Sequence, residues 1–390
     1  MNNLADDGPC ELYRQPTQAR AARVSIQVIE PTLVDEAGHC AARFLDLLAA
    51  APDLRFILWA DRRVNAALFA TTSVQVRPYF FRRLRRPQAL WLYWRLLHEP
   101  GPIYVPTAAY FDLRAFDITA GGAIPQNKAM LYFHKFNVPP QRRAKLCDLA
   151  LRQPALRIFA TTEEIAAEFR TAGWSDVRVA LPEPVSLRTR YRGNFRHLLS
   201  AGAARNDKGF EHVVALAEAL AAHNKPDAPR LVVQASGDHY GRHDMATRAQ
   251  LARLSRLSDA GIEVIRKSLP LDQYARLFEG SICLQPYRPQ DYVDKVSGIT
   301  LDALRSGAPI ITSAGTWMAR IVAHTGAGEI IVDLRPESIL AVTRRISADY
   351  SQYQKRALAA YDRLSDESGL APLVAALRAC ALAPLGVTPT

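Results

Sequence analysis

The sequence predicts an α/β protein with two doubly wound domains, each built on a parallel sheet. Three features lead to this prediction: the chain length, an ordinary composition, and a twofold alternation of short apolar runs with amphipathic stretches. At roughly 100–200 residues per domain, a chain of 390 residues suggests two domains. The chain is 49% hydrophobic and 22% charged, which is typical of globular proteins and excludes wholesale disorder.

Short apolar runs in the first half of the chain alternate with stretches of helical periodicity. The predicted strands are 24–29, 55–59, 103–105, 129–133 and 156–160. The predicted helices are 40–50, 141–152 and 163–171. Strands that alternate with helices favour a parallel sheet with helical crossovers.

The same alternation returns after a proline-rich stretch. Pro182 and Pro184 interrupt helix and sheet alike, so they mark a predicted domain boundary. The predicted strands beyond it are 197–200, 231–235, 262–265, 281–284 and 309–312, and the predicted helices are 209–222, 245–257, 271–278 and 300–306. Doubly wound sheets bind ligands beyond the carboxyl ends of their strands.

These elements divide the chain into four expected parts. They are a flexible tail at 1–20, a first Rossmann-like domain at 21–184, a second at 185–345, and C-terminal helices at 346–390. The last part is rich in Ala, Leu and Arg at helical spacing, and we expect it to pack back toward the first domain.

Cysteine content and hydropathy indicate the compartment. The five cysteines are scattered without a CxxC spacing, as in proteins of a reducing cytoplasm. Every long apolar stretch is interrupted by charge or proline before it reaches the ~18–20 residues of a spanning helix. The first residues are acidic and lack an apolar core, so we expect no secretory signal and a cytoplasmic protein.

Positive charge is concentrated in one aromatic segment. The chain carries 49 Lys and Arg against 38 Asp and Glu, and residues 77–97 mix arginines with Trp91, Tyr93 and Trp94. An anionic membrane surface attracts this composition, which would place the protein peripherally on the inner face of the plasma membrane. A solvated surface helix with an aromatic core face explains the segment equally well. Nucleic acid is the least favoured partner, because no helix-turn-helix, zinc-finger or RNA-binding aromatic signature accompanies the charge.

A glycine turn at the end of one predicted strand has the features of an anion site. Residues 199–211 read Leu-Ser-Ala-Gly-Ala-Ala-Arg-Asn-Asp-Lys-Gly-Phe-Glu, and a helix is predicted to start near Lys208. Free backbone N–H groups at a helix start attract anions, and Arg205 and Lys208 add charge and directed hydrogen bonds. This combination favours a diphosphate, with a solvated loop of incidental charge as the alternative. The P-loop pattern does not occur here.

A second segment follows the strand predicted at 281–284. A helix is predicted to begin at Ser297 and Gly298, which directs its first amides toward the cleft between the domains. Ser297 is also a good N-cap residue, and this is its alternative role. Asp302, a little over one turn further, can accept hydrogen bonds from ribose hydroxyls or be a solvated helix carboxylate.

Together the two segments resemble the GT-B-fold retaining glycosyltransferases of the large group-1 family, which uses nucleotide-sugar donors and carries a Glu-x7-Glu motif. The resemblance rests on Gly-x-x-Arg-x-x-Lys-Gly-Phe at 202–210 and on Pro-Tyr…Ser-Gly…Asp-Ala-Leu-x-x-Gly-x-Pro-Ile-Ile at 286–311. These blocks span most of the second domain, which the resemblance makes the donor side, with the first domain on the acceptor side. The resemblance implies that the donor diphosphate is bound in the second domain by Arg205, Lys208, Ser297 and Gly298.

The family's paired glutamates correspond to aspartates in this sequence. Asp294 and Asp302 have the x7 spacing, so the resemblance implies that Asp294 faces the donor sugar as a catalytic residue and that Asp302 binds the ribose. The frame around Asp302 is kept, whereas Lys-Val-Ser at 295–297 replaces the family's Pro-Phe-Gly after the first glutamate. The identity of the sugar therefore stays open.

The first domain matches the family at fewer positions. Gly38 follows the first strand, where the family places a glycine-bearing loop near the donor phosphates; its alternative role is a turn before a helix. His134 ends a predicted strand, where family members place a histidine close to the reacting sugar; its alternative role is structural. His239 and His243, with Asp238 and Asp244 beside them, could suggest metal ligands, but a solvated loop is the favoured interpretation, and the family fold normally needs no metal.

The resemblance implies a metal-independent hexosyl- or related transferase that needs no cofactor besides its nucleotide-sugar co-substrate. It would move the sugar to an acceptor hydroxyl with retention, on a glycan or lipid-linked saccharide in cell-surface polysaccharide or glycolipid assembly. One alternative is a nucleotide-sugar epimerase with this fold, which would need paired acid–base side chains that the sequence does not show. The other is a non-catalytic basic protein that binds membrane or nucleic acid, which leaves the donor-site pattern unexplained.

Overall fold

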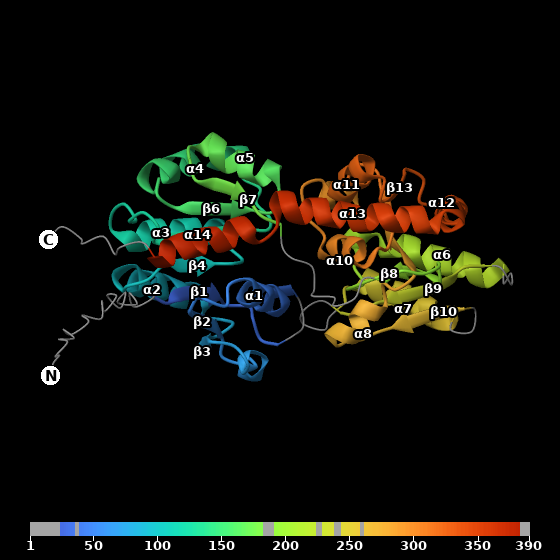
Figure 1. Cartoon of the computed structure of the whole chain (residues 1–390), viewed down its shortest axis with the longest axis horizontal. Coiled ribbons are helices and arrows are strands. Elements are labelled where there is room, and N and C mark those ends of the chain that lie inside the picture. The colour runs from blue at the N-terminus through green and yellow to red at the C-terminus, as the bar shows by residue number, and fades with distance from the viewer. Residues whose placement is uncertain are drawn as a thin grey trace, which may run out of the picture.

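In a computed structural model, the chain folds into two lobes, each organised around one parallel sheet (Figure 1). The structure describes residues 24–35, 39–181, 191–223, 228–237, 243–257 and 261–382. The expected tail at 1–20 and the expected domain boundary at 184 lie outside these residues.

Within the described residues, the first sheet has seven parallel strands in the order β3-β2-β1-β4-β5-β6-β7. Their bounds are β1 Ile26–Glu30, β2 Phe56–Asp61, β3 Val74–Phe80, β4 Ile103–Val105, β5 Ala129–Phe133, β6 Arg157–Ala160 and β7 Val177–Val179. Five of these are the predicted strands. The two others are the edge strands: Arg77 and Pro78 interrupt the apolar pattern of β3, and β7 has only three residues.

The second sheet repeats this order with six described strands, arranged as β10-β9-β8-β11-β12-β13. Their bounds are β8 His197–Ser200, β9 Arg230–Gln234, β10 Ile262–Ile265, β11 Ser281–Gln285, β12 Ile310–Ser313 and β13 Gly328–Ile331. All pairs are parallel, and the first strand of each sheet lies between its second and fourth, which is the doubly wound order. The prediction of two doubly wound α/β sheets is therefore confirmed.

Helices connect successive strands and cover both faces of each sheet (Figure 1). The helices of the first lobe are α1 His39–Ala50, α2 Arg85–His98, α3 Tyr110–Ala120, α4 Pro140–Arg152 and α5 Glu163–Ala172. Those of the second are α6 Phe210–His223, α7 Met245–Leu254, α8 Leu271–Arg276, α9 Pro289–Tyr292, α10 Gly298–Ser306, α11 Trp317–Thr325, α12 Pro336–Ala348 and α13 Tyr350–Ser368, followed by α14 Ala371–Leu382. The described short 3-10 turns are η1 Ala66–Phe69, η2 Asn206–Lys208 and η3 Ser255–Leu257.

Side-chain caps and left-handed glycines set several helix ends. Thr162 precedes α5 and its hydroxyl accepts a hydrogen bond from the Ile165 N–H at 3.3 Å. Gly173 ends the same helix with a φ of 119°, a conformation that costs a glycine little. The helix predicted at 163–171 is therefore bounded by a capping threonine and a left-handed glycine.

Buried apolar side chains fill the space on both sides of each sheet. In the first lobe, α2 to α5 pack on one face, whereas α1 and α14 pack on the other. In the second lobe, α6, α7 and α12 share one core, and α10 and α13 share the other. Each sheet is thus buried on both faces, as its continuous apolar strands require.

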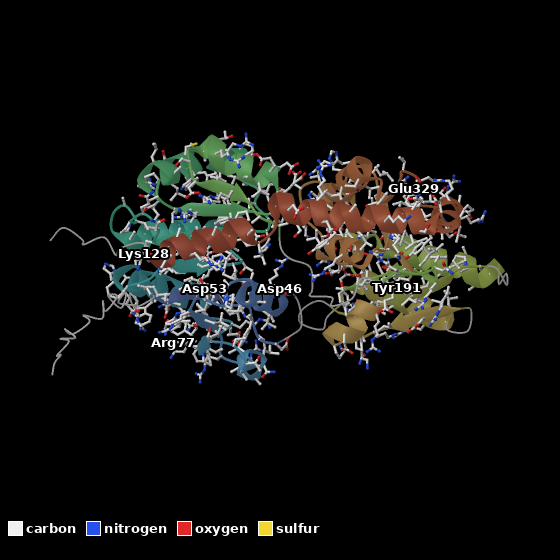
Figure 2. The ribbon with its side chains drawn as sticks, viewed as in Figure 1. Asp46, Asp53, Arg77, Lys128, Tyr191 and Glu329 are labelled. Carbon is white, nitrogen blue, oxygen red and sulfur yellow. The ribbon has the colours of Figure 1, made fainter. Side chains whose placement is uncertain are left out.

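The C-terminal helices join the two lobes. Helix α13 packs on α10 and α11 of the second lobe, and α14 packs on the first lobe through side chains such as Leu377. Arg378 of α14 lies 2.9 Å from Asp53, which Figure 2 shows close to this helix. Where the chain crosses back, the Leu181 N–H donates to the Ser368 carbonyl at 2.5 Å. The two crossings between the lobes therefore lie side by side.

The basic aromatic segment 77–97 is divided between a strand and a helix. Its first residues belong to β3, including Arg77 at the edge of the first lobe (Figure 2), and most of the rest belong to α2. Helix α2 buries Tyr93 and Leu96 and leaves Trp91 and Trp94 exposed. Among the described helices, none is both long enough and apolar enough to cross a membrane.

Replacing Leu377 with alanine should destabilise the first lobe by about 2–5 kcal/mol, because this fully buried side chain would leave a cavity between α14 and the sheet. Leu382 lies on the same helix and is 67% exposed, so Leu382→Ala is the matched control, with an expected change below ~0.5 kcal/mol. Thermal unfolding followed by near-UV circular dichroism measures both. Equal melting temperatures for the two variants would contradict the packing of α14 on the first sheet.

Candidate functional site

The carboxyl ends of the two sheets face a common cleft. The strand order reverses between β1 and β4 in the first sheet and between β8 and β11 in the second, the switch points where doubly wound sheets bind ligands. His134 follows β5 and Thr161 follows β6, while Arg205 and Lys295 lie in the loops after β8 and β11. These four residues line the same cleft, so the candidate site lies between the lobes.

Five cationic side chains line this cavity, which we call the cationic cleft and which encloses about 210 Å³. They are Arg43, Lys135, Arg205, Lys208 and Lys295. The other lining residues are His134, Thr161, Tyr292, Val296, Ser297, Gly298 and Ile299. Cations held close together in a partly desolvated site repel one another, so the cleft favours an anionic ligand.

Two glycines allow the loop after β8 to approach the rest of the site. Gly202 has a φ of 92°, and a Cβ there would lie 2.7 Å from Ile299 Cδ1 and 2.9 Å from Lys208 Nζ. Gly209 has a φ of 63°, and a Cβ there would lie 1.8 Å from the Pro286 carbonyl oxygen. Any larger residue at these two positions would therefore clash with its neighbours. The glycines allow this loop to place Lys208 against the start of α10.

Lys208 is held in surroundings that disfavour its charge. The lysine ends the 3-10 turn η2, and its Nζ lies 5.7 Å from the centre of the Tyr287 ring. Desolvation, and then the positive charge of Arg205, lower the pKa of the Lys208 amine to about 7, with Lys295 adding to the effect. Asp207 acts in the opposite direction. An anion beside Lys208 would restore its ordinary protonated state.

One carboxylate is shared by two cations of the cleft. Arg205 donates to Asp207 through Nε at 2.8 Å and through Nη2 at 2.5 Å, and also to the Tyr292 hydroxyl at 3.0 Å. Lys295 Nζ lies 3.7 Å from the same Asp207 and 4.4 Å from the centre of the Tyr292 ring. Because Asp207 offsets one charge at most, this side of the cleft keeps an excess of positive charge.

The start of α10 adds backbone donors to the cleft. Ser297 occupies the N-cap position without a side-chain cap hydrogen bond, and Gly298 is the first helical residue. Both residues and Ile299 line the cleft. The first N–H groups of a helix have no partner within the helix, so they can donate to an anion there. The predicted helix start at Ser297 and Gly298 is thus confirmed, whereas their role in diphosphate binding stays a prediction.

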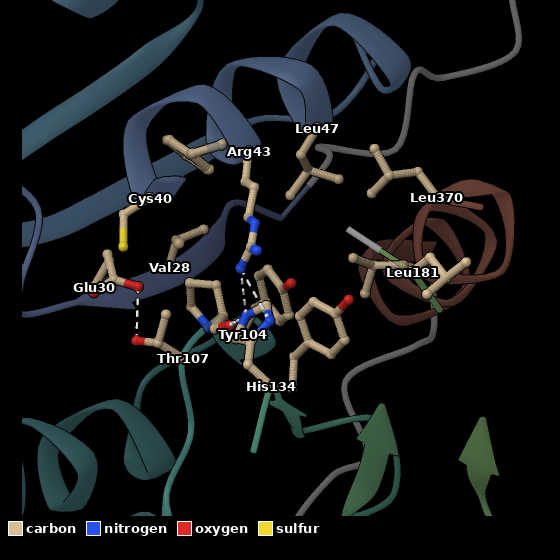
Figure 3. Close-up of a pocket in the computed structure, with 14 residues that line it drawn as sticks. Val28, Glu30, Cys40, Arg43, Leu47, Tyr104, Thr107, His134, Leu181 and Leu370 are labelled. Atoms are coloured by element: carbon tan, nitrogen blue, oxygen red, sulfur yellow. Dashed lines mark hydrogen bonds between the residues drawn. The ribbon is translucent and has the colours of Figure 1, made fainter. Parts of the chain in front are cut away.

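His134 projects from the first lobe at the edge of the cleft, with both ring nitrogens in polar contact. Its Nε2 lies 2.7 Å from the Pro106 carbonyl oxygen, which only accepts, so Nε2 carries the hydrogen. Arg43 Nη1 lies 3.0 Å from Nδ1 and 3.2 Å from Nε2, so the guanidinium group contacts the ring beside both nitrogens (Figure 3). Because Arg43 and the Pro106 carbonyl together hold the ring in place, His134 suits a positioning role better than that of a base.

Asp302 lies on the buried face of α10 rather than on the wall of the cleft. It is 1% exposed, and one carboxylate oxygen accepts a hydrogen bond from the Tyr274 hydroxyl at 2.8 Å. The alternative of a solvated helix carboxylate is therefore wrong. A ribose contact at Asp302 stays a prediction, and it would require a donor hydroxyl to reach the carboxylate beside Tyr274.

Asp294 lines a neighbouring groove between the lobes, together with Glu164 of the first lobe. Its side chain is 44% exposed and lies 3.5 Å from Arg320, which also bonds Glu164 of the first lobe at 2.9 Å. It is Lys295, the next residue, that lines the cationic cleft. The assignment of Asp294 as a catalytic residue stays a prediction, and a contact with a donor sugar would require this loop to move.

Three of the cationic residues of the cleft have no role in the sequence-based prediction: Arg43, Lys135 and Lys295. Lys135 and Lys295 directly follow His134 and Asp294, and this adjacency to predicted site residues is the signal that could have found them. Gly38 and His239, two predicted candidates, lie outside the described residues. In the described part of the chain, no group of three or more His, Cys, Asp or Glu side chains could hold a metal ion.

Comparison with solved structures identifies the arrangement of the lobes. HepE from Anabaena in complex with UDP-glucose is similar at a TM-score of 0.65 and 13% identity, over 91% of this chain and 98% of that one. Sucrose-phosphate synthase from Thermosynechococcus elongatus is similar at a TM-score of 0.63 and 13% identity, over 90% and 96%. The trehalose-6-phosphate synthase OtsA is similar at a TM-score of 0.63 and 11% identity, over 91% and 99%.

These similarities define the fold class. The protein has the GT-B fold, with two Rossmann-like domains facing across a cleft, as the sequence predicts. No family model matches the sequence, and no curated protein matches it. At identities of 11–13%, the structural likeness shows the fold alone, so the activity has to be argued from the site.

The Lys208 amine should titrate near pH 7, which the pH dependence of its acetylation, followed by mass spectrometry, would measure. Arg205→Gln should raise this midpoint because it removes a nearby positive charge. Asp207→Asn should lower it because it removes the compensating negative charge. A single midpoint common to the three proteins would show that these groups do not share one electrostatic site.

Proposed function

We propose that the protein is a glycosyltransferase that moves a sugar from a nucleoside-diphosphate sugar to an acceptor hydroxyl. The observation that carries this proposal is the convergence of five cations and the start of α10 at the facing switch points of a GT-B fold. A diphosphate provides the concentrated negative charge that such a site requires. HepE, which has this fold, is known in complex with UDP-glucose, which makes uridine the first base to test.

The proposed reaction depends on stabilising the leaving group. The bond between the sugar C1 and the diphosphate oxygen breaks, the sugar gains oxocarbenium character, and negative charge develops on the diphosphate. Arg205, Lys208 and the first amides of α10 would stabilise that charge where it develops. A cleft between two lobes can close around the donor and exclude water, which limits hydrolysis.

The proton balance needs no dedicated side-chain base. We propose that the acceptor oxygen attacks C1 on the face that the diphosphate leaves, with retention, and that the departing phosphate takes the acceptor proton. His134, held by Arg43 and the Pro106 carbonyl, would position the reacting sugar. Asp294 would face that sugar after loop movement, and Asp302 would bind the ribose. No metal is assigned a role in this scheme.

The acceptor belongs on the side of the first lobe. We propose a glycan or lipid-linked saccharide in cell-surface polysaccharide or glycolipid assembly. A nucleotide-sugar epimerase would need paired acid–base groups around the sugar, whereas the ionisable groups of the cationic cleft are lysines, arginines, His134 and Tyr292. A non-catalytic binding protein would not need cations and helix amides to converge between the lobes.

Lys208→Ala should weaken binding of the matching nucleoside diphosphate about 10–100-fold, because it removes one charged hydrogen-bond donor from the cleft. It should lower the transfer rate by about 10²–10³-fold, as expected for a donor aimed at developing charge. Isothermal calorimetry with UDP, GDP and ADP, then with their sugar conjugates, measures the first effect. Lys355→Ala, an exposed position on α13, is the control and should bind like the wild type. Unchanged affinity and rate in Lys208→Ala would refute the proposed site.

A peripheral membrane location is supported by the surface of the first lobe. Four large apolar side chains are exposed around the start and outer face of α2: Phe81 at 45%, Leu84 at 53%, Trp91 at 49% and Trp94 at 52%. Exposed arginines lie beside them, namely Arg82, Arg83 and Arg86. We call this set the aromatic-arginine face. Its composition fits the interface of an anionic membrane, on the cytoplasmic leaflet.

Changing Arg82, Arg83 and Arg86 to Ser should reduce binding to anionic vesicles about 100-fold, at ~1 kcal/mol for each arginine near the surface. Arg85 is left unchanged because it pairs with the buried Asp61 at 3.0 Å. In the control, three exposed arginines of the second lobe are changed to Ser, so that the net charge falls by the same amount. They are Arg276, Arg335 and Arg363. Sedimentation with phosphatidylserine and with phosphatidylcholine vesicles measures binding. Equal losses in the two triple variants would show that net charge, not this face, is responsible.

A further inference from the structure

Arg320 lies where the two lobes meet, beside the cationic cleft. It belongs to α11 of the second lobe, whereas Glu164 is in the first turn of α5 in the first lobe, and both helices lie along the upper edge of the molecule in Figure 1. Arg320 Nη2 donates to Glu164 at 2.9 Å, so this ion pair crosses between the lobes. The two side chains are 44% and 45% exposed, so water can replace either partner if the lobes move apart.

The same guanidinium group also holds the loop that follows α9. Its Nη1 donates to the Val293 carbonyl oxygen at 2.7 Å. Its Nη2 lies 3.5 Å from Asp294 Oδ1, which is a longer and weaker contact. Arg320 therefore contacts this loop at two successive residues, firmly through the carbonyl and loosely through the carboxylate.

This loop, residues 293–297, leads from the groove into the cationic cleft. Lys295 lines the cleft and lies 3.7 Å from Asp207. Ser297 is the N-cap of α10 and lines the cleft as well. Asp294, by contrast, lines the groove on the side of Arg320. Neighbouring side chains of one loop thus face different cavities, and Arg320 is the contact that keeps Asp294 in the groove.

Glu164 and Asp294 compete for the positive charge of Arg320. Both contact Nη2, and the contact with Glu164 is the shorter of the two. Because a single charge is shared, the closer Glu164 leaves Asp294 more weakly held, and the two carboxylates also repel each other. If the lobes separate and Glu164 withdraws, Arg320 would pair with Asp294 alone.

We propose that Arg320 is a positioning residue for Asp294, and that Glu164 releases Asp294 toward the donor sugar when the lobes come together. With the lobes apart, Arg320 keeps Asp294 in the groove. With the lobes together, Glu164 takes the guanidinium charge, while the bond to the Val293 carbonyl keeps the loop on α11. This inference rests on the proposed glycosyl transfer, which it would restrict to the state in which the lobes exclude water.

Glu164→Gln tests the release, because it removes the competing charge and keeps the size of the side chain. It should lower kcat for UDP release from UDP-glucose, with water as the acceptor, about two- to fivefold, since Arg320 would then hold Asp294 more firmly. The affinity for UDP should stay unchanged. Glu163→Gln is the matched control and should change neither value, because Glu163 pairs with Arg170 of its own helix.

Arg320→Gln in the Glu164→Gln background separates release from the mere loss of a contact between the lobes. Once residue 320 has lost its charge, it has no hold on Asp294 for Glu164 to relieve. The effect of Glu164→Gln on kcat should therefore disappear in the Arg320→Gln background. A loss of the same size in both backgrounds would overturn the proposal, and so would a Glu164→Gln variant that melts earlier but keeps its kcat.

Hydrogen exchange of residues 293–297, followed by mass spectrometry on the full chain without substrate, tests the same contacts independently of activity. Exchange should be slower in Glu164→Gln, faster in Arg320→Gln and unchanged in Glu163→Gln. Equal exchange in the wild type and Arg320→Gln would overturn the hold of Arg320 on the loop, whatever the kinetics. Failure of UDP, GDP and ADP to bind the wild type would instead overturn the proposed function, since that result concerns the cationic cleft.

Discussion

Positive charges that face one another across a cleft are the constraint on which the rest of this molecule depends. Arg43 and Lys135 come from the first lobe, and Arg205, Lys208 and Lys295 from the second. Without an anion between them, bringing the lobes closer increases their repulsion; with a diphosphate in place, the same movement becomes favourable. Lys208 already shows the cost, because burial and its cationic neighbour Arg205 bring the pKa of its amine to about 7. An anionic donor would therefore be both the ligand and the counter-charge that permits closure.

The sequence predicts best those features that depend on neighbouring residues in the chain. The alternation of strands and helices, the glycine turn at Gly202 and the helix start at Gly298 are local patterns, and each is present in the structure. Arg43 could not be predicted, because it meets His134 only through the packing of α1 over the sheet. Asp302 shows the same limit: its burial depends on Tyr274, 28 residues earlier in the chain. The edge strand β3 was not predicted, because Arg77 and Pro78 interrupt its apolar pattern. An edge strand tolerates such residues, whereas a central strand does not.

The contact between Arg43 and His134 connects two cavities of opposite character. On one side lies a cationic cleft that favours phosphate oxygens, and on the other a pocket with aliphatic walls. Leu181 and Leu370, which form part of the aliphatic wall, belong to the two segments that cross between the lobes. A change in the angle between the lobes would therefore reshape the walls of this pocket.

The position of α14 on the first lobe also affects how the chain folds while it is being translated. The strands of the first sheet are complete at Val179, but α14, which shares one face of that sheet with α1, begins at Ala371, about 190 residues later. At ~5–20 residues per second, translation of the second lobe takes roughly 10–40 s, during which side chains such as Phe44 and Met130 lack part of their cover. The nascent first lobe is thus a natural client for a chaperone. A chain that stops after the second lobe would have both sheets, but only α1 would cover this face of the first sheet.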